Sequence, residues 1–202
     1  MTNTFPYRLC SGQQESGSVC IASRGNDGEI NLRDWHPVGV IEYGYAVPDP
    51  IDTDIVWGAG RNVVTKTHLS TGQTQDITPI PLKEGDVRFD RTEPLLFSPR
   101  DPHRMYYAAN RLYETIDAGQ HWRAVSPDLS RESPGTPPSV GELISPKAAK
   151  QRGAIYAAGA SALQEGLIWI GTDDGLVWIT ADAGKNWKDV TPPSLTPWSK
   201  VT

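Results

Sequence analysis

The sequence has few of the residues that bind metals or span membranes. Its 202 residues include two cysteines, two methionines and four histidines. No apolar run approaches the roughly 20 residues that a membrane-spanning helix needs. The first residues, from Met1 to Pro6, lack the charged start and apolar core of a signal peptide. We therefore expect no membrane span and no export signal in this chain, and its compartment stays open.

Charge and motif spacing also exclude several classes of function. The formal net charge is -5, and lysines and arginines are scattered, so nothing favours nucleic-acid binding. The histidines at 68, 103 and 121 are isolated, and no pair has metal-ligand spacing. No glycine-rich phosphate loop opens a helix. We expect neither a metal nor another cofactor.

The two cysteines leave two interpretations open. Cys10 and Cys20 lie at the ends of a stretch that is typical of a hairpin, and their spacing matches no zinc motif. They form a cross-strand disulfide if the mature protein is extracytoplasmic, or else they are two ordinary half-buried thiols.

What the sequence does contain indicates an all-β protein. It has 19 glycines, 17 prolines and seven tryptophans, a composition rich in turns. In the segment from Leu167 to Pro192, runs of aromatic and β-branched residues alternate with Asp- and Gly-containing breaks at 172–175 and 182–184. This pattern predicts a three-strand antiparallel meander.

The same pattern recurs along the chain. Trp57, Tyr107 and Trp169 occupy equivalent positions, with offsets of 50 and 62 residues. A repeat of about 40–50 residues with four strands is typical of β-propeller blades. We expect a single partial β-propeller over residues 1–202, with about three to four four-stranded blades. The predicted units are 6–33 (partial), 34–80, 92–128 and 153–193, with a long loop at 128–152. The remaining blades would come from a longer polypeptide or from a second copy.

Two of the predicted turns share the pattern Thr-x-Asp-x-Gly-x-x-Trp. One contains Thr115, Asp117, Gly119 and Trp122, and the other contains Thr180, Asp182, Gly184 and Trp187. An Asp carboxylate can accept N–H bonds from its own turn, Gly permits a positive φ, and Trp covers the neighbouring strand. These residues are expected to hold a corner of each blade together.

This motif resembles the Asp-box, or BNR repeat, of sialidases, sortilin-type receptors and xyloglucanase-like glycosidases. Nearly the whole chain resembles large bacterial proteins described as glycosyl hydrolases with BNR repeats. The resemblance implies a ring that is usually seven-bladed, with Asp117 and Asp182 on its outer rim as structural residues. The predicted unit 34–80 departs from the motif, because Ser70 stands in place of the Asp and Gln75 in place of the Trp.

The densest group of polar and aromatic residues is a candidate ligand site. Trp35, His36, Tyr43 and Tyr45 suit sugar or peptide binding, and Asp34 and Glu42 lie beside them. Blade packing around a satisfied core histidine is the simpler alternative. Asp49, Glu93 and Asp173 also fall near predicted blade entrances. Asp49, Asp101, Asp173 and Asp174 lie beside Pro or Gly, however, and are expected to form turns.

We therefore favour a binding or scaffold module for a peptide, a protein or a glycan. The alternative is a glycoside hydrolase acting on polysaccharide, with Asp34 and Glu42 as acid and base candidates. That reaction needs two carboxylates about 5–9.5 Å apart across a cleft. Nothing in the sequence spacing selects such a pair, so whether the protein is an enzyme stays open.

Overall fold

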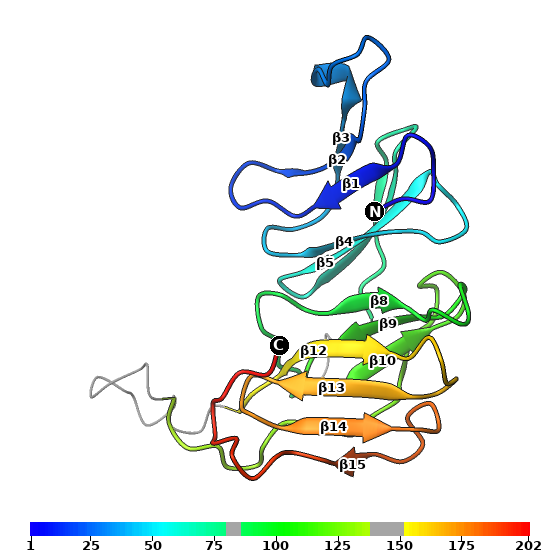
Figure 1. The fold of residues 1–202 in the computed structure, drawn as a ribbon. Helices are drawn as coiled ribbons and strands as arrows, with labels where there is room; N and C mark the ends of the chain where they lie inside the picture. Colours follow the sequence, from blue (N-terminus) through cyan, green and yellow to red (C-terminus); the bar gives the residue numbers. More distant parts are fainter. Residues whose placement is uncertain (80–85, 138–151) are drawn as a thin grey trace.

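The computed structural model describes residues 1–79, 86–137 and 152–202, and its regular structure is almost entirely β (Figure 1). Fifteen strands form four separate antiparallel sheets in these ranges. The first sheet contains β1 (Arg8–Ser11), β2 (Ser18–Ala22) and β3 (Trp35–Val38), and the second contains β4 (Tyr45–Pro48), β5 (Ile55–Gly60), β6 (Val63–His68) and β7 (Thr74–Asp76). The third contains β8 (Leu95–Phe97), β9 (Met105–Ala108), β10 (Leu112–Thr115) and β11 (Arg123–Ala124), and the fourth contains β12 (Ile155–Ala160), β13 (Ile168–Thr172), β14 (Val177–Thr180) and β15 (Lys188–Asp189). A short 3-10 helix, η1 (Leu32–Asp34), precedes β3.

Each sheet is a meander in which strands pair in chain order, and the four sheets follow one another in space (Figure 1). The first strands of successive sheets, β4, β8 and β12, contact one another, so they form the inner side of the arrangement. Consecutive four-stranded meanders around a common inner side are the blades of a β-propeller. The prediction of an all-β partial propeller is confirmed.

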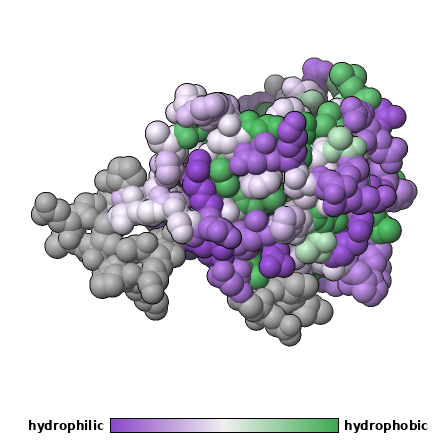
Figure 2. All heavy atoms as spheres, turned by 90° about the horizontal axis from the view of Figure 1, so that it is seen from below, coloured by the Kyte–Doolittle hydropathy of each residue, from purple (hydrophilic) through white to green (hydrophobic). Residues whose placement is uncertain are grey.

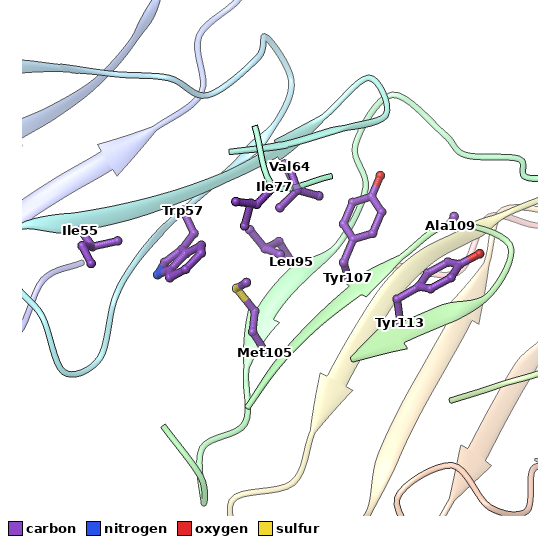
Figure 3. Packing of buried hydrophobic residues seen from close by; sticks show 10 residues of the cluster. Ile55, Trp57, Val64, Ile77, Leu95, Met105, Tyr107, Ala109 and Tyr113 are labelled. Carbon is purple, nitrogen blue, oxygen red and sulfur yellow. The ribbon is translucent and has the colours of Figure 1, made fainter. Parts of the chain in front are cut away.

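Alternation of side chains along the second strands explains why the sheets stack. Trp57 on β5 and Tyr107 on β9 both face the space between the second and third sheets, where they are buried with Leu95 and Met105 (Figure 3). Their neighbour Tyr106 faces the other way, into a second core with Ile168 and Ile170 of β13. Since successive strand residues point to opposite faces, each sheet supplies apolar side chains to both of its neighbours.

The first sheet differs from the others in strand count and in the predicted boundary. β3 leads through residues 39–44 into β4, as β7 leads into β8, so β3 is the last strand of its sheet. β1, β2 and β3 therefore match the second, third and fourth strands of a blade. The sequence boundary at residue 34 placed Trp35 at the start of the second unit, whereas Trp35 pairs with Ile21 of β2. Between β3 and β4 the extended backbone is interrupted, and Tyr43 adopts a φ of 63°.

A disulfide joins the first two strands. Cys10 and Cys20 are directly opposite in the β1–β2 register and are bonded to each other. Cys20 is buried against Val38, Val40 and Val56. Of the two interpretations of the cysteines, the structure contains the cross-strand disulfide.

The predicted loop at 128–152 lies partly outside the described residues. The described ends of the 128–152 loop are anchored. Leu129 is fully buried, and Arg152 Nε donates to the Arg131 backbone oxygen at 2.8 Å.

Among the residues that the structure describes, nothing covers one face of each of the two end sheets. On the first sheet, Leu9, Ile21 and Trp35 form a cross-strand row in which Leu9 is 58% and Trp35 44% exposed. On the fourth sheet, Trp169 is 48% exposed. Elsewhere, polar residues separate the surface hydrophobic residues into small groups, as seen from the side of β15 (Figure 2).

Candidate functional site

The two Thr-x-Asp-x-Gly-x-x-Trp turns have the same hydrogen bonds. In the first, Thr115 Oγ1 donates to Asp117 Oδ1 at 2.9 Å and accepts the Gly119 N–H at 3.0 Å. Asp117 Oδ1 also accepts the His121 N–H at 2.9 Å. The bonds from the backbone and then the side chain of His121 lower the pKa of Asp117 to about 2. The carboxylate therefore stabilises its own turn.

The second turn repeats this geometry between β14 and β15. Thr180 Oγ1 donates to Asp182 at 2.8 Å and accepts the Gly184 N–H at 3.0 Å, and Asn186 takes the place of His121. Bonds from the Asn186 side chain and backbone lower the pKa of Asp182 to about 2. A structural role for both aspartates, as expected from the sequence, remains the interpretation that fits these contacts.

The tryptophans of these turns connect neighbouring sheets. Trp122 Nε1 donates to the backbone oxygen of Ile77 at 2.9 Å, and Trp187 Nε1 donates to that of Val125 at 2.9 Å. Each bond runs from the last turn of one sheet to the chain that leaves the preceding sheet.

The second sheet keeps a carboxylate at its β6–β7 turn although it lacks the motif Asp. Asp54, which precedes β5, accepts both the Ser70 N–H and the Ser70 hydroxyl at 2.7 Å. The missing aspartate is thus replaced by one from a distant position, a substitution that the local sequence pattern could not reveal.

Asp34, Trp35 and His36 do not form a common site in the structure. Asp34 Oδ2 accepts the Asn31 N–H at 2.9 Å and caps η1. Trp35 faces the uncovered side of the first sheet, and His36, next in the strand, faces the opposite side. Burial, followed by the charge of Arg8, lowers the pKa of His36. All three lie at the outermost strand of their sheet, away from the inner strands, which differs from the expected cleft position.

Glu42, Tyr43 and Tyr45 lie at the opposite end of β3 from Asp34. Glu42 forms an ion pair with Arg61, and its Oε2 accepts the Glu15 N–H at 3.3 Å. The Arg91 guanidinium lies over the Tyr43 ring, with its Cζ 5.3 Å from the ring centroid. The chain of β3 separates Asp34 from Glu42, so the structure does not bring together the proposed acid and base.

A pocket of about 410 Å³ opens beside these residues. It is lined by Arg61, Asn62, Phe89, Asp90 and Arg91. Arg61 and Asn62 form the tight turn between β5 and β6, with φ values of 49° and 64°. A positive φ at both residues is the usual geometry of a two-residue hairpin turn, because its twist matches that of the flanking strands. We call this the Arg61–Arg91 pocket.

Glu93 holds that turn from beneath. It is 0% exposed, and its Oε1 accepts the Asn62 N–H at 2.7 Å. Within the described ranges, Oε2 has no hydrogen-bond partner, and neither has the buried Tyr107 hydroxyl. Burial raises the pKa of Glu93 to about 7, and the charge of Asp90 acts in the same direction. The folded protein therefore protonates this side chain at a much higher pH than an ordinary glutamate.

The segment that carries Asp90 is fixed by Arg88. Arg88 Nη2 donates to Asp128 Oδ2 at 2.5 Å, and its backbone N–H donates to Asn110 Oδ1 at 3.1 Å. Burial alone would raise the pKa of Asp128, but bonds from Arg88 and Ser130 outweigh it and hold the pKa at about 2. This half-buried ion pair anchors the connection between the second and third sheets.

The inner strands present two tyrosines beside Asp90. Tyr45 on β4 and Tyr156 on β12 interact electrostatically, and burial, then Tyr156, raises the pKa of Tyr45. Lys200 lies 4.0 Å from the Tyr156 ring centroid and 3.3 Å from Asp90 Oδ2. Tyr45 was a candidate from the sequence, whereas no motif marks Asp90, Tyr156 or Lys200. Tyr156 lies alone on β12, and the other two lie outside the strands.

The other aspartates considered from the sequence stabilise turns. Asp49 accepts the Ile51 and Asp52 N–H groups at 2.8 Å and the Trp57 indole N–H at 2.8 Å. Asp101 accepts the His103 N–H at 3.1 Å. Asp173 and Asp174 accept the Ala154 and Gly153 N–H groups at 2.8 and 3.1 Å. The contacts of Asp49 and Asp101 agree with their interpretation as turn residues, whereas Asp173 and Asp174 join the β13–β14 turn to the residues before β12.

The described residues were also considered as metal ligands and as membrane-spanning helices. Within the part of the chain that the structure describes, no group of three His, Cys, Asp or Glu side chains could hold a metal ion. Over the same ranges, no helix is long and apolar enough to cross a membrane.

Comparison with known proteins gives the fold but no family. No protein-family model and no curated protein matches the sequence. The chain is similar to the GH74 xyloglucanase of Xanthomonas campestris, with a TM-score of 0.58 and 16% identity over 95% of this chain and 30% of that one. It is also similar to the extracellular domain of a one-component system of B. thetaiotaomicron, with a TM-score of 0.55 and 12% identity over 92% of this chain and 21% of that one.

Both are β-propeller proteins. The chain thus has a β-propeller-like repeat fold and spans less than a third of the length of either. At such low identity the likeness shows the fold and no more.

Proposed function

We propose that this chain is a binding module of a larger β-propeller protein, and that it holds a peptide, a protein or a glycan at the Arg61–Arg91 pocket. The observation that carries this proposal is the neutralisation of the carboxylates at the pocket. Glu42 is paired with Arg61, and Asp90 with Lys200. Ion-paired carboxylates are poorly suited to acid–base chemistry, whereas arginines and tyrosines beside an open pocket suit recognition.

A direct test is to apply the labelled protein to arrays of peptides and oligosaccharides, including xyloglucan fragments. Arg61→Ala and Arg91→Ala should abolish the signal of a true ligand. Arg33→Ala is the matched control, since Arg33 is exposed on η1, beyond the other end of β3. Ligands whose binding is equal in all four proteins would show that the pocket is not the site.

Glycoside hydrolysis is the second candidate, favoured by the likeness to a xyloglucanase and by the desolvated Glu93. Its test is release of reducing ends from xyloglucan, with Glu42→Gln and Glu93→Gln as variants. Hydrolysis that is lost in either variant, while the fold is retained, would replace the binding proposal with an enzymatic one.

The two uncovered sheet faces are suited to packing against further blades. We propose that further blades pack against the Leu9–Ile21–Trp35 row and against Trp169, either from the same polypeptide or from a second copy. Light scattering combined with denaturant titration distinguishes these sources, because a stable dimer indicates a second copy. A monomer whose stability is unchanged by Trp169→Glu and Leu9→Glu in the full-length protein would contradict the proposal.

A further inference from the structure

The contacts of Lys200 define a small group of side chains from separate parts of the fold. The Lys200 ammonium lies over the Tyr156 ring of β12 and beside Asp90 of the 86–94 segment. Burial raises the pKa of Asp173, in the turn between β13 and β14, and the Lys200 charge opposes that rise. One cation therefore lies against an aromatic face and beside the Asp90 carboxylate, and its charge is also felt by Asp173.

Lys200 itself arrives on a segment that adheres to the sheets by few bonds. The Trp198 N–H donates to the Asp174 oxygen at 3.2 Å, and the Val201 N–H donates to the Thr172 oxygen at 3.1 Å. The side chain of Lys200 is 46% exposed. Beside it, a hollow of about 330 Å³ lies under Val201 and Thr202 on the face of β12, β13 and β14. Two backbone hydrogen bonds and the packing of Val201 against Gly171 therefore attach this segment to the fourth sheet.

An aromatic ring beside a carboxylate is suited to binding an organic ammonium group. A primary ammonium gains attraction from the face of a tyrosine and from an ion pair with a nearby carboxylate, and each is stronger where water is partly excluded. The anchored Arg88–Asp128 pair holds Asp90 in place before any ligand arrives. Preorganisation of this kind reduces the entropy lost on binding.

We propose that Tyr156 and Asp90 form a binding site for a primary ammonium group of a ligand, and that Lys200 is its intramolecular occupant. This inference rests on the proposed role of the chain as a binding module and names the chemistry of one ligand group. Lysine side chains of a peptide and amino groups of a sugar share that chemistry.

The test removes the internal occupant and offers external ones. Lys200→Met keeps a stem of similar length without the charge, and Lys200→Arg is the matched control that keeps a cation in place. The probes are Nα-acetyl-lysine N-methylamide, D-glucosamine and the uncharged Nα-acetyl-norleucine N-methylamide, titrated while amide chemical shifts are followed by NMR. Thermal unfolding of each variant checks that the fold is retained.

We expect Lys200→Met to bind at least one ammonium probe at least tenfold more tightly than the unaltered protein or Lys200→Arg. A second change, Asp90→Asn, should abolish the gain. Preference for the lysine derivative indicates a peptide ligand, and preference for glucosamine an amino sugar. The proposal is overturned if Lys200→Met gains no affinity, if the norleucine derivative binds equally well, or if Asp90→Asn has no effect. None of these outcomes depends on the Arg61 and Arg91 array test, so the two proposals can fail separately.

Discussion

The indole nitrogen of Trp122 lies 2.9 Å from the backbone oxygen of Ile77, a residue 45 positions earlier that ends the second sheet. Trp187 makes the equivalent bond to Val125 of the third sheet. The ring of Trp122 also packs edge-on against Tyr107. A single side chain thus closes the turn of one sheet and fastens that sheet to its predecessor.

Trp122→Phe should therefore weaken the contact between the second and third sheets. The change keeps an aromatic ring but leaves the Ile77 oxygen without its donor, which costs about 1–3 kcal/mol. Chemical denaturation should show this loss in the free energy of unfolding. Trp169→Phe, at a half-exposed position, is the control and should change it by less than about 0.5 kcal/mol. Equal effects of the two changes would argue against the bond.

The turn aspartates should make the fold sensitive to strong acid. The pKa of Asp117 is about 2 in the folded protein against an ordinary 3.8, so its stabilising effect is complete above pH 3.8 and is lost as the pH falls toward 2. Asp117→Asn should lower the melting temperature at neutral pH and flatten its dependence on pH between 2 and 4. Asp27→Asn, in an exposed loop, should do neither. A steep acid transition that persists in Asp117→Asn and in Asp182→Asn would contradict the role of these turns.

Glu93 should act in the opposite direction. Its pKa is about 7 when folded and its ordinary value is 4.5, so the folded state binds the extra proton between these values. The contribution of Glu93 to the free energy of unfolding should therefore be greatest below pH 4.5. It should fall by roughly 3 kcal/mol as the pH rises through 7. Glu93→Gln should remove that decline and raise the free energy of unfolding at pH 8. Urea titrations at pH 5 and pH 8 measure both effects, and a decline that is unchanged in Glu93→Gln would assign it to other groups.

The disulfide should matter chiefly for the first sheet. Opening the Cys10–Cys20 link, 10 residues apart, frees a short loop in the unfolded chain and should cost about 2–3 kcal/mol. The double change Cys10→Ser and Cys20→Ser should lower stability to that extent without altering the cores around Trp57 and Ile168. Mass spectrometry after alkylation under non-reducing conditions checks the bond itself. Two alkylated cysteines in protein from an oxidising compartment would contradict it.

The repeated turns and apolar runs made the architecture predictable, because a hairpin depends on residues close together in the sequence. Trp57, Tyr107 and Trp169 all lie on the second strand of their sheets, and the two Thr-x-Asp-x-Gly-x-x-Trp turns have matching bonds. The predicted equivalence of Tyr107 and Trp169 is wrong by one residue, because the strand registers match Trp169 with Tyr106. The candidate site was less predictable. A one-strand shift in the boundary moved Trp35 and His36 from an inner strand to an outer one. No sequence pattern links Asp90, Tyr156 and Lys200, because three separate segments meet only in the folded chain.

The stacking of the sheets in chain order has a consequence for how the protein opens. Each sheet buries its faces only against the sheets before and after it, so the chain behaves as a nearly one-dimensional array whose stability is a sum of neighbour interactions. Amide hydrogen exchange should accordingly be graded along the array. Protection is expected to be highest in β5 and β9, on either side of the Trp57 core, and to decrease toward β1 and toward β15. A ligand that spans several sheets would then slow exchange at the ends more than at the centre.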